Sequence, residues 1–444
     1  MCDIESKLPL VGVKPEKSKK RGSIIAGIAL ILLINSFVII WVGFLKSDDT
    51  EAELESSELN SIVRNDVKNS LSFMDTLKNF NFSNLINLIE IEDSNAMTQR
   101  LELNKLLIDF ILKEPLVEVN NSCKIPSITM PTPLNCLTAG NRIFNGLKKD
   151  PSKVGILIQL GFDADTLEIY MHQVYDIVDY FFIIESTTSH LQHQKKPLIW
   201  QLLQNQNRFA IFKDKIVNFV LDDSDTAKNI NDNSIWALES QQEHSRWTKF
   251  LEWNKNYQYF SDDDILGFGD ADEIPSRQNL LLLKHCSISR DVTKAIDIGI
   301  WFPLSYIKWA FKTDFPVHRS VPYSLGDPSF WTVSNAKKFN VNGNAPTRMR
   351  GKSGHFLLGG AHLSNYLYPP FAMIKMLTCS ECNGVTHLKE WKKLIDDKNV
   401  RGLEKFFIDH NVNLYSGRTV SLEDLDAKNK ETVSLPWLGA LFFF

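Results

Sequence analysis

Six carboxylates lie close together in the stretch 262-DDDILGFGDADEIPS-276. An apolar run over residues 265–268 divides them into two groups, and they are Asp262, Asp263, Asp264, Asp270, Asp272 and Glu273. Like charges at this density repel one another and raise one another's pKa. The pattern therefore indicates that a positively charged ligand lies beside part of this stretch in the working protein.

The second group has the spacing of a hard-cation site. Asp270 and Asp272 are separated by one residue. Two carboxylates with this spacing after a strand can bind one Mn²⁺ or Mg²⁺, which then bridges to a diphosphate. The alternative is a solvated turn before Pro275, in which Asp272 or Glu273 caps a helix over 276–284. The first group precedes the apolar run, and we expect it to form a solvated turn at the end of a long helix.

Apolar patterns on either side predict the elements that position these carboxylates. Short apolar runs are typical of strands buried on both faces, and amphipathic spacing predicts helices. The patterns predict strands over 154–158, 180–184, 216–220 and 265–268, and helices over 167–178 and 236–260. This alternation predicts parallel crossover units and hence an α/β fold with a mostly parallel central sheet. Asp270, Asp272 and Glu273 then lie at the carboxyl end of a strand, where such sheets bind ligands.

The N-terminal part of the chain predicts a membrane anchor. Residues 22–45 carry no charge, and the run is longer than the ~20 residues that a helix needs to cross a bilayer. It is too long for the apolar part of a cleaved signal peptide. Basic residues precede the run and an acidic segment follows it, which predicts a cytoplasmic tail and a lumenal body.

We expect four regions: a cytoplasmic tail over 1–21, a membrane helix over 22–45, a lumenal stem over 46–150 and a catalytic domain over 151–444. N-glycosylation triplets at Asn81 and Asn120 agree with a lumenal body. In an oxidising lumen, Cys123 and Cys136 are candidate partners for a disulfide across a short loop. The net charge of -4 gives no reason to expect a nucleic-acid partner.

Four blocks of sequence, in order, resemble glycosyltransferase family 17. The run 265-ILGFGDADEIPSRQNLLLLK-284 is similar to the family's central pattern, a strand followed by D-x-D-E-I-P and a helix. Residues 166–198, 243-EHSRW-247 and 359-GGAHLSNYL-367 are similar to its other blocks, although Ala361 stands where the family has Trp. The resemblance implies a GT-A type fold that takes a UDP-sugar donor, in the first place UDP-GlcNAc.

An enzyme of this kind needs a cation and a base. Asp270 and Asp272 would hold Mn²⁺ or Mg²⁺, which anchors the donor and neutralises the leaving diphosphate. His362 would complete the metal site, with a structural role as its alternative.

Inverting transfer needs a carboxylate that takes the proton of the acceptor hydroxyl. Glu273 and Glu243 are both candidates, and an intrahelical pair with Arg246 is the alternative role for Glu243. The remaining expected site residues bind the donor, and they are Glu185, Lys196, Arg246, Arg348 and Arg350.

The leading hypothesis is a Golgi type II membrane enzyme that transfers N-acetylglucosamine from UDP-GlcNAc to a mannose of an N-glycan. One alternative is a transferase of the same fold that uses another nucleotide sugar, because sugar choice depends on pocket side chains. Another is an inactive lumenal glycan-binding protein. The intact Asp270, Asp272 and Glu273 argue against inactivity, whereas Ala361 argues weakly for it.

Overall fold

The computed structural model describes residues 134–137, 142–189, 197–205, 209–225, 237–301, 303–304, 306–313, 328–341, 344–350, 352–363, 375, 388–399, 402, 405–406, 409 and 417–421. The predicted tail, membrane helix and most of the stem lie outside this set, as do Asn81, Asn120, Cys123 and Lys196. Within the set, no helix has both the length and the apolar character that a membrane crossing requires.

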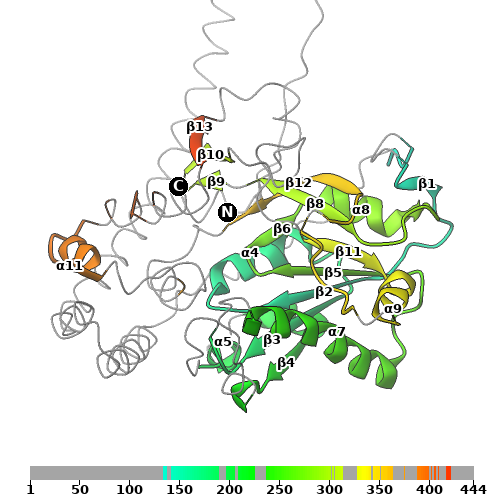
Figure 1. The fold of residues 1–444 in the computed structure, drawn as a ribbon, viewed down its shortest axis with the longest axis horizontal. Coiled ribbons are helices and arrows are strands. Elements are labelled where there is room, and N and C mark those ends of the chain that lie inside the picture. Colours follow the sequence, from blue (N-terminus) through cyan, green and yellow to red (C-terminus); the bar gives the residue numbers. More distant parts are fainter. Residues whose placement is uncertain are drawn as a thin grey trace, which may run out of the picture.

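An eight-stranded sheet forms the centre of the fold (Figure 1). Its strands in spatial order are β4 (Ile216–Leu221), β3 (Tyr180–Ser186), β2 (Val154–Gln159), β5 (Ile265–Asp270), β11 (Ser329–Thr332), β8 (Ile296–Trp301), β12 (Phe356–His362) and β6 (Glu273–Pro275). The predicted strands are therefore present, and the α/β class is confirmed.

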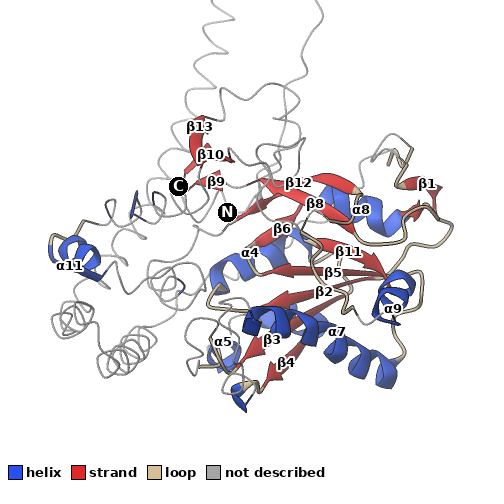
Figure 2. Cartoon of the chain, viewed as in Figure 1, coloured by secondary structure: helices blue, strands red, loops and turns tan. Residues whose placement is uncertain are grey.

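One half of the sheet is parallel. Strands β4, β3, β2 and β5 pair in parallel, as predicted. The connecting helices are α4 (Ala164–Val174), α5 (Ile199–Asn205), the 3-10 helix η2 (Ala210–Lys215) and α7 (Ala237–Tyr257). Helix α7 packs across β2, β3 and β4 (Figure 2). These strands pair in parallel because each crossover helix returns the chain to the end of the sheet where the previous strand began.

The other half of the sheet is mixed, while four of the seven strand pairings in the whole sheet are parallel, in agreement with the prediction of a mostly parallel sheet. Strand β11 runs antiparallel to both β5 and β8, and β6 runs antiparallel to β12, while β8 and β12 are parallel. For β6 the reason lies within the acidic motif itself. A tight turn at residues 271–272 reverses the chain between β5 and β6, because no helix intervenes to restore the strand direction.

Side chains of the strands alternate between two apolar clusters. In β2, Ile156 and Ile158 belong to one cluster and Leu157 belongs to the other. In β5, Ile265 and Leu266 divide in the same way. Because successive side chains of a strand point to opposite faces, both faces of the sheet are covered. The strand ends that carry the acidic motif therefore rest on a rigid scaffold.

Two smaller sheets and three further helices complete the described elements. The small sheets pair β1 (Phe144–Leu147) with β7 (Cys286–Ile288), and β10 (Tyr306–Thr313) with β9 (Pro303–Leu304) and β13 (Gly417–Ser421). The helices are α8 (Arg277–His285), α9 (Val333–Val341) and α11 (Leu388–Asp396).

A disulfide joins Cys136 to Cys286 at the first residue of β7. The predicted pairing of Cys136 with Cys123 is therefore wrong. The local spacing of Cys123 and Cys136 suggested a short loop, but the chain returns to Cys136 only after 150 residues. The bond ties the segment before β1 to the strand that follows α8.

Candidate functional site

Acidic residues gather where β2 and β5 end. These strands are parallel neighbours, and Gln159 of β2 lies opposite Asp270 of β5. Asp163 follows β2 as the first residue before α4. Asp272 lies in the turn after β5, and Glu273 begins β6. The acidic motif therefore lies at the carboxyl edge of the parallel half, where the sequence placed it.

The turn that carries this motif is buried. Asp272 and Glu273 are 3% and 4% exposed. The Leu363 N–H, just beyond β12, donates to the Asp272 carbonyl at 2.7 Å. Helix α8 is capped by Ser276, whose hydroxyl accepts from the Asn279 N–H. The alternative of a solvated turn in which Asp272 or Glu273 caps the helix is therefore wrong, because β12 covers the turn.

The first acidic group also differs from the expected solvated turn. Asp262 is exposed and lies 2.7 Å from Lys337. Asp264, by contrast, is buried. Its carboxylate accepts from the backbone N–H groups of Lys153 and Ser261, both at 2.7 Å. Asp264 therefore joins the segments that lead into β2 and β5, because one carboxylate accepts backbone hydrogen bonds from both.

Two arginines hold Asp270. Arg246 of α7 is fully buried, and its Nη2 lies 3.0 Å from Asp270 Oδ1. Arg348 places Nη1 2.6 Å from Asp270 Oδ2. Burial would raise the pKa of Asp270, but Arg348 and Arg246 outweigh it and lower that pKa. Asp270 is therefore held as a carboxylate.

Glu243 faces the same arginine from α7. Arg348 donates to its Oε1 through Nη2 and, at 2.8 Å, through Nε, and Arg350 donates at 3.1 Å. Arg246 donates to Asp270 instead of forming the alternative intrahelical pair with Glu243. Burial would raise the pKa of Glu243, but Arg348, Arg246 and Arg350 lower it well below its usual range. A carboxylate held in this way is a weak base.

Glu273 has the opposite balance. Its Oε2 accepts from the Asp270 N–H at 3.1 Å, and its Oε1 lies 3.1 Å from Arg348 Nη1. Burial raises the pKa of Glu273, and repulsion from Asp270 adds to it, while Arg348 opposes the shift without cancelling it. Of the two candidate bases, Glu273 therefore binds a proton more readily.

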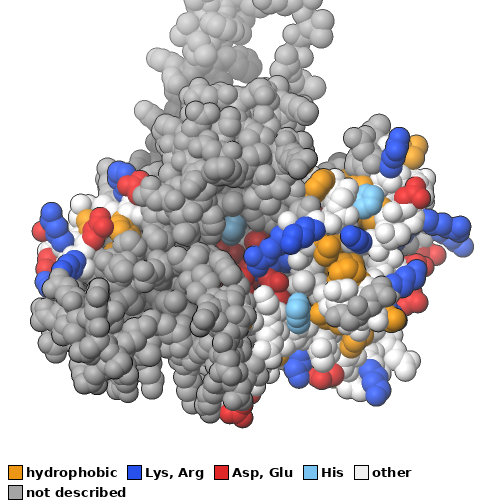
Figure 3. Space-filling model, viewed as in Figure 1, with side chains coloured by type: hydrophobic (Ala, Val, Ile, Leu, Met, Phe, Trp, Pro, Cys, Tyr) orange, Lys and Arg blue, Asp and Glu red, His pale blue; other side chains and the backbone are white. Residues whose placement is uncertain are grey.

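Asp272 meets a different set of cations. Lys375 Nζ lies 2.7 Å from Asp272 Oδ2 and 2.9 Å from Asp163 Oδ1, and His362 Nε2 lies 3.3 Å from the same oxygen of Asp272. Burial would raise the pKa of Asp272, but Lys375 and His362 lower it well below its usual value. Figure 3 shows acidic and basic side chains meeting near the centre of this face of the molecule.

The structure brings together two of the three predicted metal ligands. Asp272 and His362 are adjacent, and their carboxylate oxygen and imidazole nitrogen are donors that Mn²⁺ accepts. The third, Asp270, faces Arg246 and Arg348. Accordingly, no group of three His, Cys, Asp or Glu side chains in the described part of the chain is arranged to hold a metal ion. The donor types fit, with further ligands left to the substrate.

The predicted donor-binding residues Glu185, Arg350 and Lys196 differ in where they lie. Glu185 is fully buried, and its carboxylate accepts from the backbone N–H groups of Ile199 and Trp200. It therefore caps the first turn of α5 instead of facing a ligand, because helix N-termini leave such donors without partners. Arg350 is half-exposed beside the acidic cluster. Lys196 lies outside the described residues.

Sequence reasoning missed Asp163 and Lys375. Asp163 follows the predicted strand over 154–158 by a few residues, so the rule that ligands bind at the carboxyl ends of strands could have found it. Lys375 comes from a part of the sequence without a periodic pattern, 103 residues after Asp272. Only the tertiary structure reveals its place in the site.

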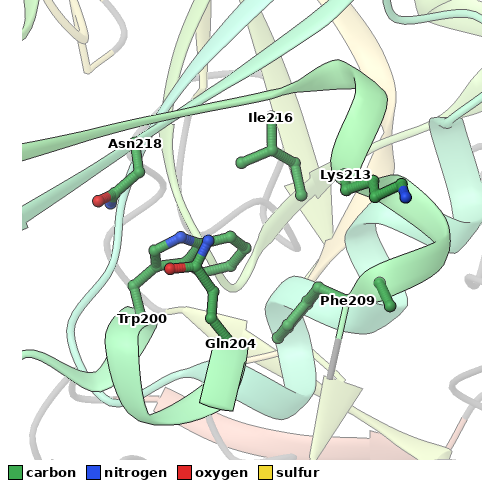
Figure 4. A pocket seen from close by; sticks show the side chains of 7 residues that line it. Trp200, Gln204, Phe209, Lys213, Ile216 and Asn218 are labelled. Carbon is green, nitrogen blue, oxygen red and sulfur yellow. The ribbon is translucent and has the colours of Figure 1, made fainter. Parts of the chain in front are cut away.

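A separate pocket of about 260 Å³ lies beside β4. Residues of α5, η2 and β4 line it, among them Trp200, Lys213 and Asn218 (Figure 4). Strand β4 is the edge strand at the opposite end of the parallel half from β5. The pocket is therefore distinct from the acidic cluster.

Residues 144–298 match the family described as Glycosyltransferase family 17. The match runs from β1 into β8 and so includes Glu243, Asp270, Asp272 and Glu273, about a third of the chain. This confirms the resemblance read from the sequence. No curated protein is significantly similar to the chain.

Proposed function

Because residues 144–298 carry a glycosyltransferase family 17 domain, we propose that the protein is a Golgi type II membrane enzyme. It transfers N-acetylglucosamine from UDP-GlcNAc to a mannose of an N-glycan, with inversion at the anomeric carbon. The observation that carries this proposal is the acidic pair Asp270 and Asp272 at the carboxyl end of β5, surrounded by basic side chains. Such an edge suits a divalent cation that would bridge to an anionic diphosphate.

The arginines of the site divide between positioning and binding. Arg246 is fully buried and donates to the Gly269 carbonyl at 2.8 Å as well as to Asp270, so it orients the end of β5. Arg350 has a half-exposed guanidinium that can reach a diphosphate from solvent. Arg348 pairs with Glu243, Asp270 and Glu273, and so balances the carboxylates that would surround the donor.

Metal dependence is part of the proposal. Asp272 and His362 would hold Mn²⁺ or Mg²⁺ together with oxygens of the donor. A bound cation would neutralise the charge that develops on the leaving diphosphate. Asp270 would support this site from the neighbouring position while Arg246 and Arg348 keep it ionised.

Glu273 is the preferred base. A general base works best when its pKa lies nearer the working pH, and burial raises the pKa of Glu273. The pKa of Glu243 is lowered by three arginines. Glu273 would accept the proton of the acceptor hydroxyl as that oxygen attacks the anomeric carbon and UDP leaves.

The test is transfer and hydrolysis measured on the purified full-length protein with a panel of UDP-sugars and Mn²⁺. We expect UDP-GlcNAc to be the preferred donor, and Asp272→Ala to abolish transfer in a folded protein. Asp262→Asn is the matched control, since Asp262 belongs to the same acidic stretch but is exposed and pairs with Lys337. If the protein neither transfers nor hydrolyses any of the donors, that result would indicate a glycan-binding protein instead.

A further inference from the structure

A lysine forms an ion pair with Asp272, the carboxylate that is proposed to bind the metal. Lys375 Nζ lies 2.7 Å from Asp272 Oδ2, and His362 Nε2 lies 3.3 Å from the same oxygen. Lys375 also lies 2.9 Å from Asp163 Oδ1. Asp272, the carboxylate that would hold a divalent cation, therefore already contacts a protein cation.

A divalent cation and the Lys375 ammonium cannot share this oxygen. Two cations within a few ångströms repel each other, and the repulsion is strong where water is scarce. The side chains of Asp272 and Asp163 are 4% and 11% exposed, so little water is present to screen it. Binding of a divalent cation at Asp272 Oδ2 therefore requires Lys375 to give up its bond to that oxygen.

Asp163 offers the lysine a second partner. It comes from the turn after β2, whereas Asp272 comes from the turn after β5, and these strands are neighbours. Lys375 can leave Asp272 and keep one ion pair. Without the charge of Asp163, the lysine would depend on Asp272 alone, and the site would lose part of its attraction for cations.

We propose that Lys375 is a resident counter-cation of Asp272 that competes with the divalent cation of the donor complex, and that Asp163 retains the lysine when the cation binds. The proposal rests on the proposed function, since the cation accompanies the diphosphate of a nucleotide sugar. It requires that substitutions of Lys375 and Asp163 change the affinity for a divalent cation in opposite directions.

The experiment titrates Mn²⁺ alone into the purified full-length protein and follows free Mn²⁺ by its electron paramagnetic resonance signal. Lys375→Met should bind Mn²⁺ more tightly and Asp163→Asn more weakly, each by ~10–100-fold, as is typical of residues beside metal ligands. Lys284→Met is the matched control, because Lys284 forms a 3.0 Å pair with Asp179, which lies at the amino end of β3, away from the acidic cluster at the carboxyl ends. It should leave Mn²⁺ affinity unchanged.

Thermal melting of each variant checks that it is folded, and Lys375→Gln replaces Lys375→Met if the latter does not fold. Equal or weaker Mn²⁺ binding by the folded Lys375 variant overturns the proposal, as does tighter binding by Asp163→Asn. Absence of Mn²⁺ binding together with sugar transfer in EDTA overturns the competition and leaves the transferase function standing. Tighter binding by Lys375→Met in a protein that transfers no sugar supports the competition and contradicts the proposed function.

Discussion

Arg348 donates a hydrogen bond of 2.6 Å from Nη1 to Asp270 Oδ2, across 78 residues of chain. The same nitrogen lies 3.1 Å from Glu273 Oε1, and Arg348 Nε donates to Glu243 Oε1 at 2.8 Å. One guanidinium therefore balances carboxylates from β5, β6 and α7. The planar, forked guanidinium suits this role, whereas a lysine ammonium could not contact all three with the same geometry.

Removal of this guanidinium should destabilise the fold. Arg348→Met leaves Glu243 and Glu273 buried without their main counter-charge, and loss of one partner from a buried ion pair costs about 3–5 kcal/mol. Urea unfolding measures the loss. Arg350→Met is the control, because its side chain is 51% exposed and pairs with the same Glu243. We expect the control to lose less than ~1 kcal/mol, and equal losses in both variants would contradict the central role of Arg348.

Glu273→Gln should lower turnover while the affinity for UDP with Mn²⁺ stays similar. The substitution keeps the size of the side chain and removes its ability to take a proton, and general-base catalysis contributes ~10²–10⁴-fold. Steady-state rates and isothermal titration of UDP with Mn²⁺ measure the two effects separately. Glu243→Gln should change turnover less, because arginines already hold the pKa of Glu243 low.

A different outcome would reassign Glu273. If Glu273 only orients the metal site, UDP affinity should fall by ~10–100-fold together with turnover. Near-normal turnover of Glu273→Gln would mean that the base lies elsewhere, and Glu243 becomes the next candidate.

Glu185→Ala should affect stability and not donor binding. The substitution leaves the buried N–H groups of Ile199 and Trp200 without their acceptor, and each unsatisfied buried donor costs about 1–3 kcal/mol. Chemical unfolding should reveal this loss, while the KM for the donor remains that of the wild type. A raised KM in a protein of unchanged stability would instead favour the direct donor contact that the sequence suggested.

His172 should make the protein less stable in mild acid. It is 1% exposed, packs edge-on against Phe212, and burial lowers its pKa from 6.5 to about 4. Between these values the unfolded state binds more protons than the folded state, so stability rises with pH. The free energy of unfolding therefore falls as the pH drops from 6.5 to about 4, with a slope from His172 of at most ~1.4 kcal/mol per pH unit.

Denaturant unfolding across this pH range measures the slope. His172→Phe keeps an aromatic ring beside Phe212 and cannot titrate, so its slope should be smaller by that amount. A His172→Leu variant should show the same reduced slope. Identical slopes in wild type and both variants would mean that the folded and unfolded states bind the His172 proton equally well, and that burial does not lower its pKa.

The sequence alone determined the elements that carry the site. The apolar runs of β2, β3 and β5 are buried on both faces, and such strands produce the clearest local pattern. The position of Asp270, Asp272 and Glu273 after β5 followed directly from that pattern. These features were predictable because they depend on neighbours in the sequence.

Only the tertiary structure decided the partners of those carboxylates. Arg348 reaches Asp270 and Glu273, Lys375 joins Asp163 to Asp272, and Cys136 bonds to Cys286 across long separations in the chain. The direction of β11 is equally non-local, since it depends on pairing with β5 and β8. Ion pairs and strand pairing depend on distances through space, and a periodic pattern along the chain carries no record of those distances.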